Sequence, residues 1–261
     1  STTVQVDSVH TCSYNPSLGS GGGGKKPISI DLGNDGFAFT NVDDSNIFFD
    51  INGDGFKHRT AWPTADDGLL AYDIDGNGKI EHADEISFAG YKYGAQTDLE
   101  GLKAFDANGD GVFSAADDKW LKFGVWQDAN QNGVTDPGEF RTLADMGVAS
   151  IALTSDGQFS IVNDQTVHGV GTVTKTDGST LDLADVTMQY SSDVQVTNAD
   201  GSQQVVSQSP FSPSGEELNG TDGNDLILGK TGNNIVNAGA GGDIVMEDGG
   251  NDFIDGGAGN D

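Results

Sequence analysis

The chain has 261 residues, of which 41 are acidic and 12 are basic, and its formal net charge is -29. This charge excludes nucleic acid and anionic lipid surfaces as natural partners, and it makes metal cations the first class of partner to consider. A single cysteine excludes an intrachain disulfide, so metal is the expected staple if the protein is exported.

The sequence has no apolar run that approaches the length of a membrane span. Its first residues, STTVQVDSVH, lack the pattern of a signal peptide. Two compartments therefore stay open: the cytosol, or the outside of the cell after export by a route that needs no N-terminal signal.

The composition divides the chain into four parts. Residues 1–26 are polar and end in a glycine run, which is typical of a tail or linker, and residues 27–190 have the apolar periodicity of a globular module. Residues 191–217 are rich in Ser, Gln and Pro and are expected to be a second linker. Residues 218–261 can be written in units of nine.

Alternating and helical patterns follow one another within the module. Strands are expected at 27–32, 36–40 and 46–50, then helices at 97–105, 114–121 and 137–147, then strands at 149–154, 158–162, 168–175 and 180–190. The sequence therefore predicts an α+β fold. In this fold, EF-hand-like calcium loops with short helices pack on β-hairpins, and the start of a parallel β-roll follows.

Four loops of the module have the ligand spacing of an EF-hand. The loop at 128–139, DANQNGVTDPGE, matches throughout and has Gly133 at the sixth position, where the chain must turn sharply. Its ligands at positions 1, 3, 5, 7, 9 and 12 are Asp128, Asn130, Asn132, the Val134 carbonyl, Asp136 and Glu139. In the loop at 106–117, these positions hold Asp106, Asn108, Asp110, the Val112 carbonyl, Ser114 and Asp117.

Two further loops match less completely. The loop that begins at residue 73 places in register Asp73, Asp75, Asn77, the Lys79 carbonyl and Glu81, then Asp84 at position 12 with Glu85 beside it. The loop that begins at residue 50 has only a front half, Asp50, Asn52 and Asp54, so it needs a remote carboxylate, such as Asp66 or Asp67, or holds no metal. A polar turn without metal is the alternative for each loop. Calcium fits these oxygen ligands better than magnesium, which demands a small rigid octahedron.

The nine-residue units at the C-terminal end follow the pattern G-G-x-G-x-D-x-U-x. Their sixth position supplies a carboxylate for calcium in most units, namely Asp225, Asp243, Asp252 and Asp261, whereas the second unit has Asn234. The apolar residue two positions later (Ile227, Val245, Ile254) is expected to point into a parallel β-roll. The fifth unit is cut short, so we expect the repeats to continue beyond it. The alternative, a flexible Gly/Asn linker, would not keep a period of nine.

Two motifs of the module are specific. They read WPTADDGLLAYDIDGNGKI at 62–80 and VWQDANQNG at 125–133. With PISIDL at 27–32 and GVGTVTKTDGSTLDLADV at 169–186, they resemble the self-processing module of FrpC-type repeats-in-toxin proteins over most of residues 27–190. The repeats at 218–261 are similar to the C-terminal part of the same proteins.

This resemblance implies that calcium folds the module and that the bond between an Asp and the first Pro of the module is then cut. In the family, the Asp carboxylate attacks its own carbonyl to give an anhydride, which a lysine of another protein captures as an isopeptide bond. Here the junction is Lys26–Pro27, and lysine cannot form the anhydride. The sequence has one Asp-Pro bond, Asp136–Pro137, and it lies inside the best-matched calcium loop, where Asp136 is expected to be a ligand.

Two classes of function therefore stay open. The first is a self-processing module, active or disabled, of a type I-secreted toxin-like protein. The second is a purely structural or adhesive calcium-dependent segment of a large exported adhesin or toxin. Both place the chain outside the cell or on the bacterial surface, with calcium as its cofactor.

Overall fold

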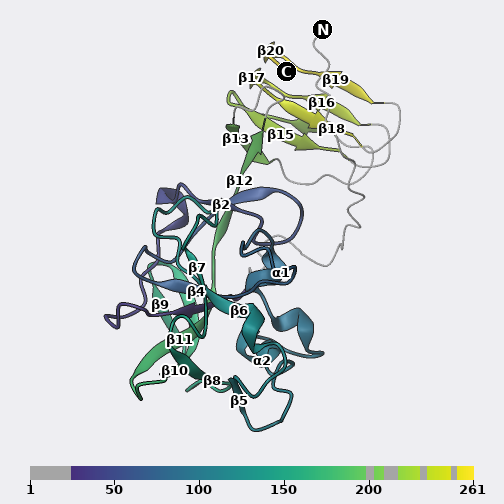
Figure 1. The fold of residues 1–261 in the computed structure, drawn as a ribbon. Helices are drawn as coiled ribbons and strands as arrows, with labels where there is room; N and C mark the ends of the chain where they lie inside the picture. Colours follow the sequence, from purple (N-terminus) through teal and green to yellow (C-terminus); the bar gives the residue numbers. More distant parts are fainter. Residues whose placement is uncertain (1–24, 198–202, 209–216, 230–233, 248–251) are drawn as a thin grey trace. The chain divides into compact units, whose positions relative to one another are not determined.

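The computed structural model describes residues 25–197, 203–208, 217–229, 234–247 and 252–261 (Figure 1). The chain forms two compact units. Within the described residues, the first unit, here called the large unit, comprises residues 25–55 and 60–190. The second, here called the repeat unit, comprises residues 56–59 and the described residues from 191 to 261. Most of the expected tail at 1–26 lies outside the described residues.

A nine-stranded antiparallel sheet organises the large unit. Its strands are, in spatial order, β5 (Val112–Ser114), β8 (Val148–Ala152), β10 (Gln165–Lys175), β11 (Thr180–Thr187), β1 (Ile28–Ile30), β4 (Gly68–Tyr72), β6 (Phe123–Trp126) and β7 (Phe140–Thr142), with β9 (Ser160–Val162) paired to β10. The short first strand β1 thus lies in the middle of the sheet, between β11 and β4.

Each face of this sheet carries its own apolar core, because successive side chains of a strand point to opposite faces. In β4, Leu70 and Tyr72 belong to one cluster, and Leu69 and Ala71 belong to the other. The first cluster also contains residues of the helical segment at 98–105, and the second contains two fully buried tryptophans. Burial on both faces explains why β4 reads as a continuous apolar run.

Helices are few and short in the described part of the chain. They are the α-helices α1 (Ala83–Ile86) and α2 (Asp98–Leu102) and the 3-10 turns η1 (Val42–Asp44), η2 (Ala89–Tyr91) and η3 (Trp120–Lys122). Helix α2 packs closely on η2 because Gly101 has no side chain: a Cβ there would lie 2.0 Å from the Phe88 carbonyl oxygen. None of the helices in these residues has the length and apolar character to cross a membrane.

The expected α+β fold with helix-flanked EF-hand-like loops is therefore wrong, and the chain is mainly β. The apolar residues Phe140 and Leu143 are spaced as on a helix, but residues 140–142 form β7 and pair with β6. Of the helix expected at 114–121, Ser114 ends strand β5, which pairs with β8, and Trp120–Lys122 form only the 3-10 turn η3. Two apolar residues at a spacing of three fit either structure, and sheet pairing decided between them.

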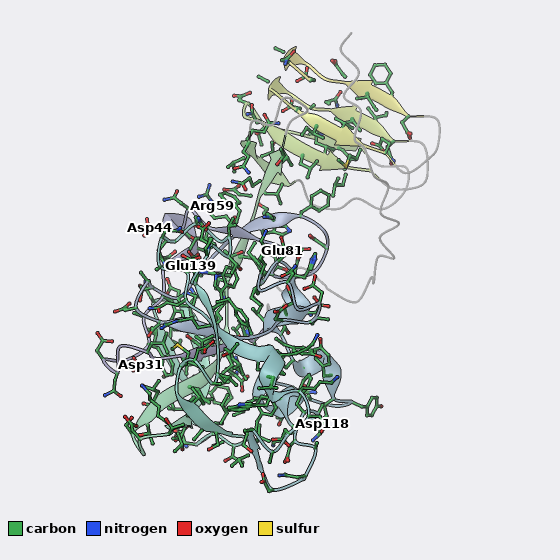
Figure 2. The ribbon with its side chains drawn as sticks, viewed as in Figure 1. Asp31, Asp44, Arg59, Glu81, Asp118 and Glu139 are labelled. Carbon is green, nitrogen blue, oxygen red and sulfur yellow. The ribbon has the colours of Figure 1, made fainter. Side chains whose placement is uncertain are left out.

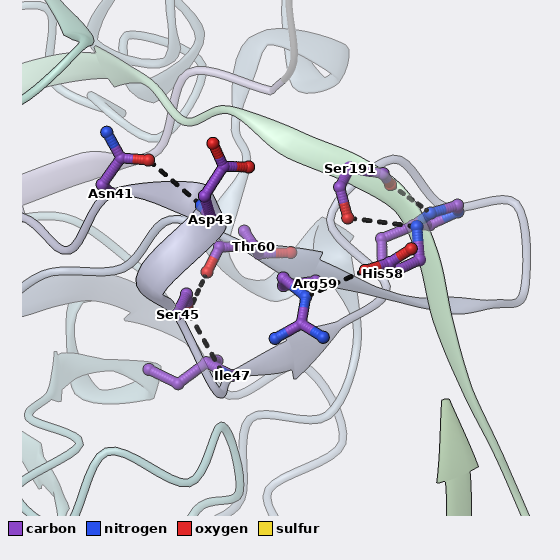
Figure 3. Close-up of polar contacts among 9 residues, drawn as sticks. Asn41, Asp43, Ser45, Ile47, His58, Arg59, Thr60 and Ser191 are labelled. Carbon is purple, nitrogen blue, oxygen red and sulfur yellow. Dashed lines mark hydrogen bonds and ion pairs between the residues drawn. The ribbon is translucent and has the colours of Figure 1, made fainter. Parts of the chain in front are cut away.

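A network of hydrogen bonds fixes the segment that precedes residue 50 (Figure 3). Ser45 Oγ donates to the Thr60 carbonyl (2.6 Å) and accepts from the Ile47 amide (3.1 Å), and the Thr60 amide donates to the Ile47 carbonyl (2.9 Å). The short strands here are β2 (Phe48–Phe49) and β3 (Lys57–Thr60). The first loop with EF-hand spacing therefore starts from an ordered strand.

The repeat unit is built from stacked short strands. They are β12 (Tyr190–Thr197), β13 (Gln203–Gln208), β14 (Glu217–Asn219), β15 (Asp225–Leu228), β16 (Ile235–Asn237), β17 (Ala240–Gly241), β18 (Ile244–Met246), β19 (Phe253–Asp255) and β20 (Ala258–Gly259). Strands β14, β16 and β19 pair in parallel, as do β13, β15 and β18. In the same unit, Arg59 Nε donates to Asp193 Oδ2 at 3.2 Å, and the residues expected as a linker carry β12 and β13.

Candidate metal centres

The loop at 128–139 shows the geometry that the other loops repeat. Asp128 is buried, and its two carboxylate oxygens accept from the amides of Asn132 (3.1 Å) and Gly133 (2.8 Å). Gln131 and Gly133, at positions 4 and 6, have positive φ values of 58° and 69°. This backbone brings the side chains at positions 1, 3 and 5 to one side of the loop.

Glu139 closes this loop from position 12. Its Oε1 accepts from the Ala129 amide (3.1 Å) and its Oε2 from the Asp136 amide (2.9 Å). Burial raises the pKa of Asp128, and the nearby Glu139 charge raises it further. A cation between these two buried carboxylates would offset the burial and the repulsion that raise the pKa of Asp128.

The side chains at positions 3, 5 and 9 of the same loop also converge. Asn130 Nδ2 and Asn132 Nδ2 both donate to Asp136 Oδ2, at 2.7 and 2.9 Å, and these two bonds lower the pKa of Asp136. Val134 is half exposed, with its carbonyl at position 7. The structure thus brings together the side chains at positions 3, 5 and 9 that the spacing predicts as ligands, and Asp136 is part of this cluster.

The loop at 106–117 is closed in the same way by a shorter acid. Asp106 accepts from the amides of Gly109 (2.8 Å) and Gly111 (3.0 Å). The buried Asp117 accepts from the Ala107 amide (2.8 Å) and the Ser114 amide (2.8 Å), at positions 2 and 9. The expected ligands Asn108, Asp110 and Val112 are linked by further bonds within the loop.

The loop that begins at residue 73 is closed by Glu85 and not by its neighbour Asp84. Glu85 is buried and accepts from the Glu81 amide (2.7 Å) and the His82 amide (3.1 Å), whereas Asp84 is exposed. Carboxylate oxygens of Asp73, Asp75 and Glu85 lie within 4.8 Å of one another. The closing acid is therefore at position 13 of the loop and not at position 12, because the short helix α1 turns the Glu85 side chain back toward the loop.

The remaining expected ligands of this loop lie around the same three carboxylates. Asn77 Nδ2 donates to Asp75 Oδ2 (3.0 Å) and to Glu81 Oε2 (3.2 Å), and Asn77 Oδ1 accepts from the Lys79 amide (2.7 Å). Burial raises the pKa of Glu85. The predicted metal ligands of this loop are all oxygen atoms, which calcium prefers.

The two neighbouring acids offer a matched test. We expect Glu85→Gln to weaken calcium binding at this loop by at least about tenfold, because one buried charged ligand is lost. Asp84→Asn removes the same charge from an exposed side chain and is expected to leave the affinity unchanged. Isothermal titration calorimetry of both variants measures the difference, and equal effects would contradict the assignment of Glu85.

Loops 73–85 and 128–139 are joined through their eighth positions. Thr135 Oγ1 accepts from the Ile80 amide (2.9 Å) and donates to the Ile80 carbonyl (3.0 Å), and both residues are buried. Filling one loop should therefore favour order in the other. Figure 2 labels Glu81 and Glu139, which belong to these two loops.

The loop that begins at residue 50 has only the front of this arrangement. Asp50 Oδ2 accepts from the Gly55 amide (3.0 Å), and Asn52 Oδ1 accepts from the Asp54 amide (3.1 Å). Asp50 Oδ1 is buried without a hydrogen-bond partner, and burial raises the Asp50 pKa. Of the two remote carboxylates suggested by the sequence, Asp67 accepts from the Ala38 amide (3.0 Å) and Asp66 accepts from Thr64 Oγ1 (2.6 Å).

In the repeat unit, acidic side chains line up every 18 residues. Asp243 Oδ1 accepts from the Asp225 amide (2.9 Å), and Asp261 Oδ1 accepts from the Asp243 amide (3.1 Å). Asn234 and Asp252 form the other column, in which the Asn234 amide donates to Asp252 Oδ1 (2.9 Å). Two nonapeptides thus make one turn. Burial and the charges of Asp225 and Asp261 raise the pKa of Asp243, whose Oδ2 is buried without a hydrogen-bond partner.

The apolar positions of the repeats divide between buried and exposed. Ile227 is fully buried and packs with Val236, and Val245 is partly buried against them. Ile254, expected in the same core, is 49% exposed, and it lies in β19 at the edge of its sheet.

The junction residues lie at the start of β1. Lys26 Nζ donates to the Gln96 carbonyl (2.8 Å), and the Pro27 carbonyl accepts from the Val186 amide (3.0 Å). Two buried acids that the sequence analysis missed lie near them. Asp185 stands opposite Ile28 in the sheet, and Asp98 begins α2. Neither residue belongs to a ligand spacing that would mark it in the sequence.

The pKa values of Asp98 and Asp185 are both raised well above the ordinary value of 3.8. Burial raises the pKa of Asp98 to about 7, and the Asp185 charge adds to this shift. Burial raises the pKa of Asp185 to about 6, and the Lys26 charge opposes this shift. Asp98 Oδ1 accepts from the Ala89 amide (2.7 Å), and its Oδ2 is buried without a hydrogen-bond partner.

Comparison with known proteins agrees with this arrangement. Residues 28–189 match the SPM domain, and these residues contain the four expected loops. The chain belongs to the SPM domain family. Residues 215–246 and 248–261 match the RTX calcium-binding nonapeptide repeat, so the chain is a calcium-binding module of an RTX protein. The SPM domain of this chain therefore precedes RTX repeats, as the sequence predicts.

The chain is also similar in sequence to a curated protein. The iron-regulated protein FrpA of Neisseria meningitidis serogroup C is 35% identical over 172 residues. The match covers 61% of this chain but 15% of FrpA. The resemblance to FrpC-type proteins is thereby confirmed at the level of the family.

Proposed function

We propose that the SPM domain of this chain is a calcium-folded scaffold of an exported RTX protein, in which the self-processing junction is silenced by Lys26. The observation that carries this proposal is the set of three loops in which a buried acid closes the ring of ligands: Glu85, Asp117 and Glu139. Each would gain from a calcium ion that offsets the cost of burying its charge.

The charge of the whole chain supports a role for calcium in folding. With a net charge of -29, the compact state repels itself until cations bind. RTX repeat proteins are typically exported. Calcium is scarce in the cytosol and near millimolar outside the cell, so weak sites of the extracellular type would fold the chain only after export. We therefore propose that the module acts outside the cell or on the bacterial surface, after type I secretion.

The silent junction follows from the chemistry of residue 26. An Asp before Pro27 could attack its own carbonyl through the carboxylate, and the anhydride could then pass to a lysine of another protein. Lys26 has no carboxylate, and its amine donates to the Gln96 carbonyl. We therefore expect neither cleavage nor an isopeptide product from this chain.

The test uses chelated protein to which millimolar calcium is added. We expect a large change in far-UV circular dichroism and an unchanged intact mass. Loss of the first 26 residues would contradict the silenced junction, and an unchanged spectrum would contradict calcium-dependent folding.

A substitution at residue 26 tests whether the module can still cut the bond before Pro27 when an Asp stands there. We expect Lys26→Asp to be cut before Pro27 after calcium is added, whereas Lys25→Asp, with the same change of charge one residue earlier, stays intact. A Lys26→Asp variant that folds with calcium and is never cut would favour a purely structural or adhesive segment.

A further inference from the structure

Strand β13 lies directly beside the parallel strands of the RTX repeats, although it precedes the repeats in the sequence. The match to the RTX repeat begins at residue 215, whereas β13 comprises Gln203–Gln208. Ser207 stands opposite Asp225, which lies 18 residues later, and the same spacing of 18 separates Asp225 from Asp243. Strand β13 therefore takes the place of one turn of the roll without having the repeat sequence.

The other edge of β13 ends the stack of parallel strands. Strand β12 pairs with this edge in the antiparallel orientation, with Val194 opposite Val206. Consecutive turns of the roll pair in parallel, so an antiparallel strand on the far edge of β13 leaves no place for another turn there. An uncovered edge would expose amides and carbonyls that can pair with other chains. The β12–β13 pair thus covers the N-terminal edge of this sheet of the roll.

An apolar cluster joins the β12–β13 pair to the repeats. Val194, Val206 and Leu226 are buried in it, and Ile244 of β18 packs against them. This cluster is separate from the core that contains Ile227, because successive side chains of β15 point to opposite faces of the sheet. The pair therefore contributes side-chain packing as well as backbone pairing to the first turns of the roll.

A segment inside the SPM match completes this cluster. The Phe56 side chain packs against its buried residues, and strand β3, which follows Phe56, is the neighbour of β12 in the sheet. His58 Nδ1 lies 3.0 Å from the Ser191 carbonyl oxygen (Figure 3). Arg59 Nε donates to Asp193 Oδ2 at 3.2 Å. The SPM domain thus supplies backbone, polar and apolar contacts to the strand that precedes the repeats.

We propose that the β12–β13 pair, anchored by residues 56–59, is the N-terminal cap of the RTX β-roll and the point from which the roll folds. The first turn of an uncapped roll has to order its chain without a neighbouring strand, whereas each later turn gains such a neighbour. The cap gives the first turn a strand to pair with. The SPM domain thus acts as a template for the repeats that follow it, whether or not its junction is cut.

The first test follows the refolding of the full, unmodified chain from urea by pulsed hydrogen exchange and mass spectrometry. Saturating calcium is present throughout, so the result does not depend on whether calcium triggers folding. We expect the amides of β12 and β13 to be protected first, those of β15 next, and those of β18 and β19 last. Protection of β18 or β19 before β13, or together with it, would overturn the proposal, because the roll would then not start at the cap.

A second test compares two truncations within the same apolar cluster. Phe56→Ala shortens a side chain of the cap, and Ile244→Ala shortens one of β18; both side chains are partly buried. We expect Phe56→Ala to slow the protection of β15 about tenfold, because contacts that form early in folding set the folding rate. Ile244→Ala should leave that rate unchanged and speed exchange from the folded chain instead. An unchanged rate for β15 in Phe56→Ala would overturn the proposal, and the first test needs neither variant.

Discussion

The Asp117→Ala variant is expected to need at least about tenfold more calcium to fold than the unmodified chain, because hydrogen bonds to a charged group contribute about 1.5–3 kcal/mol each. Asp117 occupies position 12 of its loop and accepts hydrogen bonds from the backbone amides of Ala107 and Ser114. Its removal leaves two amides and one end of the ligand ring unsatisfied.

The neighbouring residue provides the control. Asp118 is exposed, so Asp118→Ala removes the same charge without touching the loop (Figure 2). Far-UV circular dichroism during a calcium titration of chelated protein gives the midpoint for each variant. If both variants shifted the midpoint equally, net charge and not loop closure would control folding.

The sequence predicted the front of each loop well and its closure less well. Positions 1 to 6 are local, so Asp128 and Gly133 could be assigned from spacing alone. Closure depends on the backbone that follows: the short helix α1 turns Glu85, and not the neighbouring Asp84, back toward the loop. The ligand spacing does not report this turn of the backbone.

The helix expected at 137–147 was mispredicted for a related reason, whereas the helix expected at 97–105 contains α2. In an EF-hand, helices flank the loop, and the apolar spacing at 137–147 is compatible with one. In this chain, β7 follows the loop because Gly124 of β6 lets the neighbouring strand approach closely: a Cβ at Gly124 would lie 2.3 Å from the Arg141 carbonyl oxygen. The ligand spacing predicts the local geometry of the loop, but it does not predict whether a helix or a strand follows the loop.

The buried acids near the junction should make the stability of the calcium-loaded large unit depend on pH. The folded pKa of Asp98, about 7, lies above its ordinary value of 3.8, so the fold favours the protonated form. This contribution is fully present below pH 4 and is lost as the pH rises through 7. Between pH 5 and 8, the loss attributable to Asp98 is about 3 kcal/mol of unfolding free energy, at 1.36 kcal/mol per pH unit.

We expect Asp98→Asn to remove most of this loss, because the amide cannot ionise while its oxygen can still accept from the Ala89 amide. Urea unfolding at pH 5 and pH 8 in saturating calcium measures the difference, and Asp118→Asn, which changes an exposed acid, should keep the full loss. The comparison between variants cancels the titration of the calcium ligands, which all three proteins share. An unchanged pH dependence in Asp98→Asn would mean that Asp98 is ionised in the folded chain at both pH values, and it would contradict the rise in the Asp98 pKa that burial and the Asp185 charge cause.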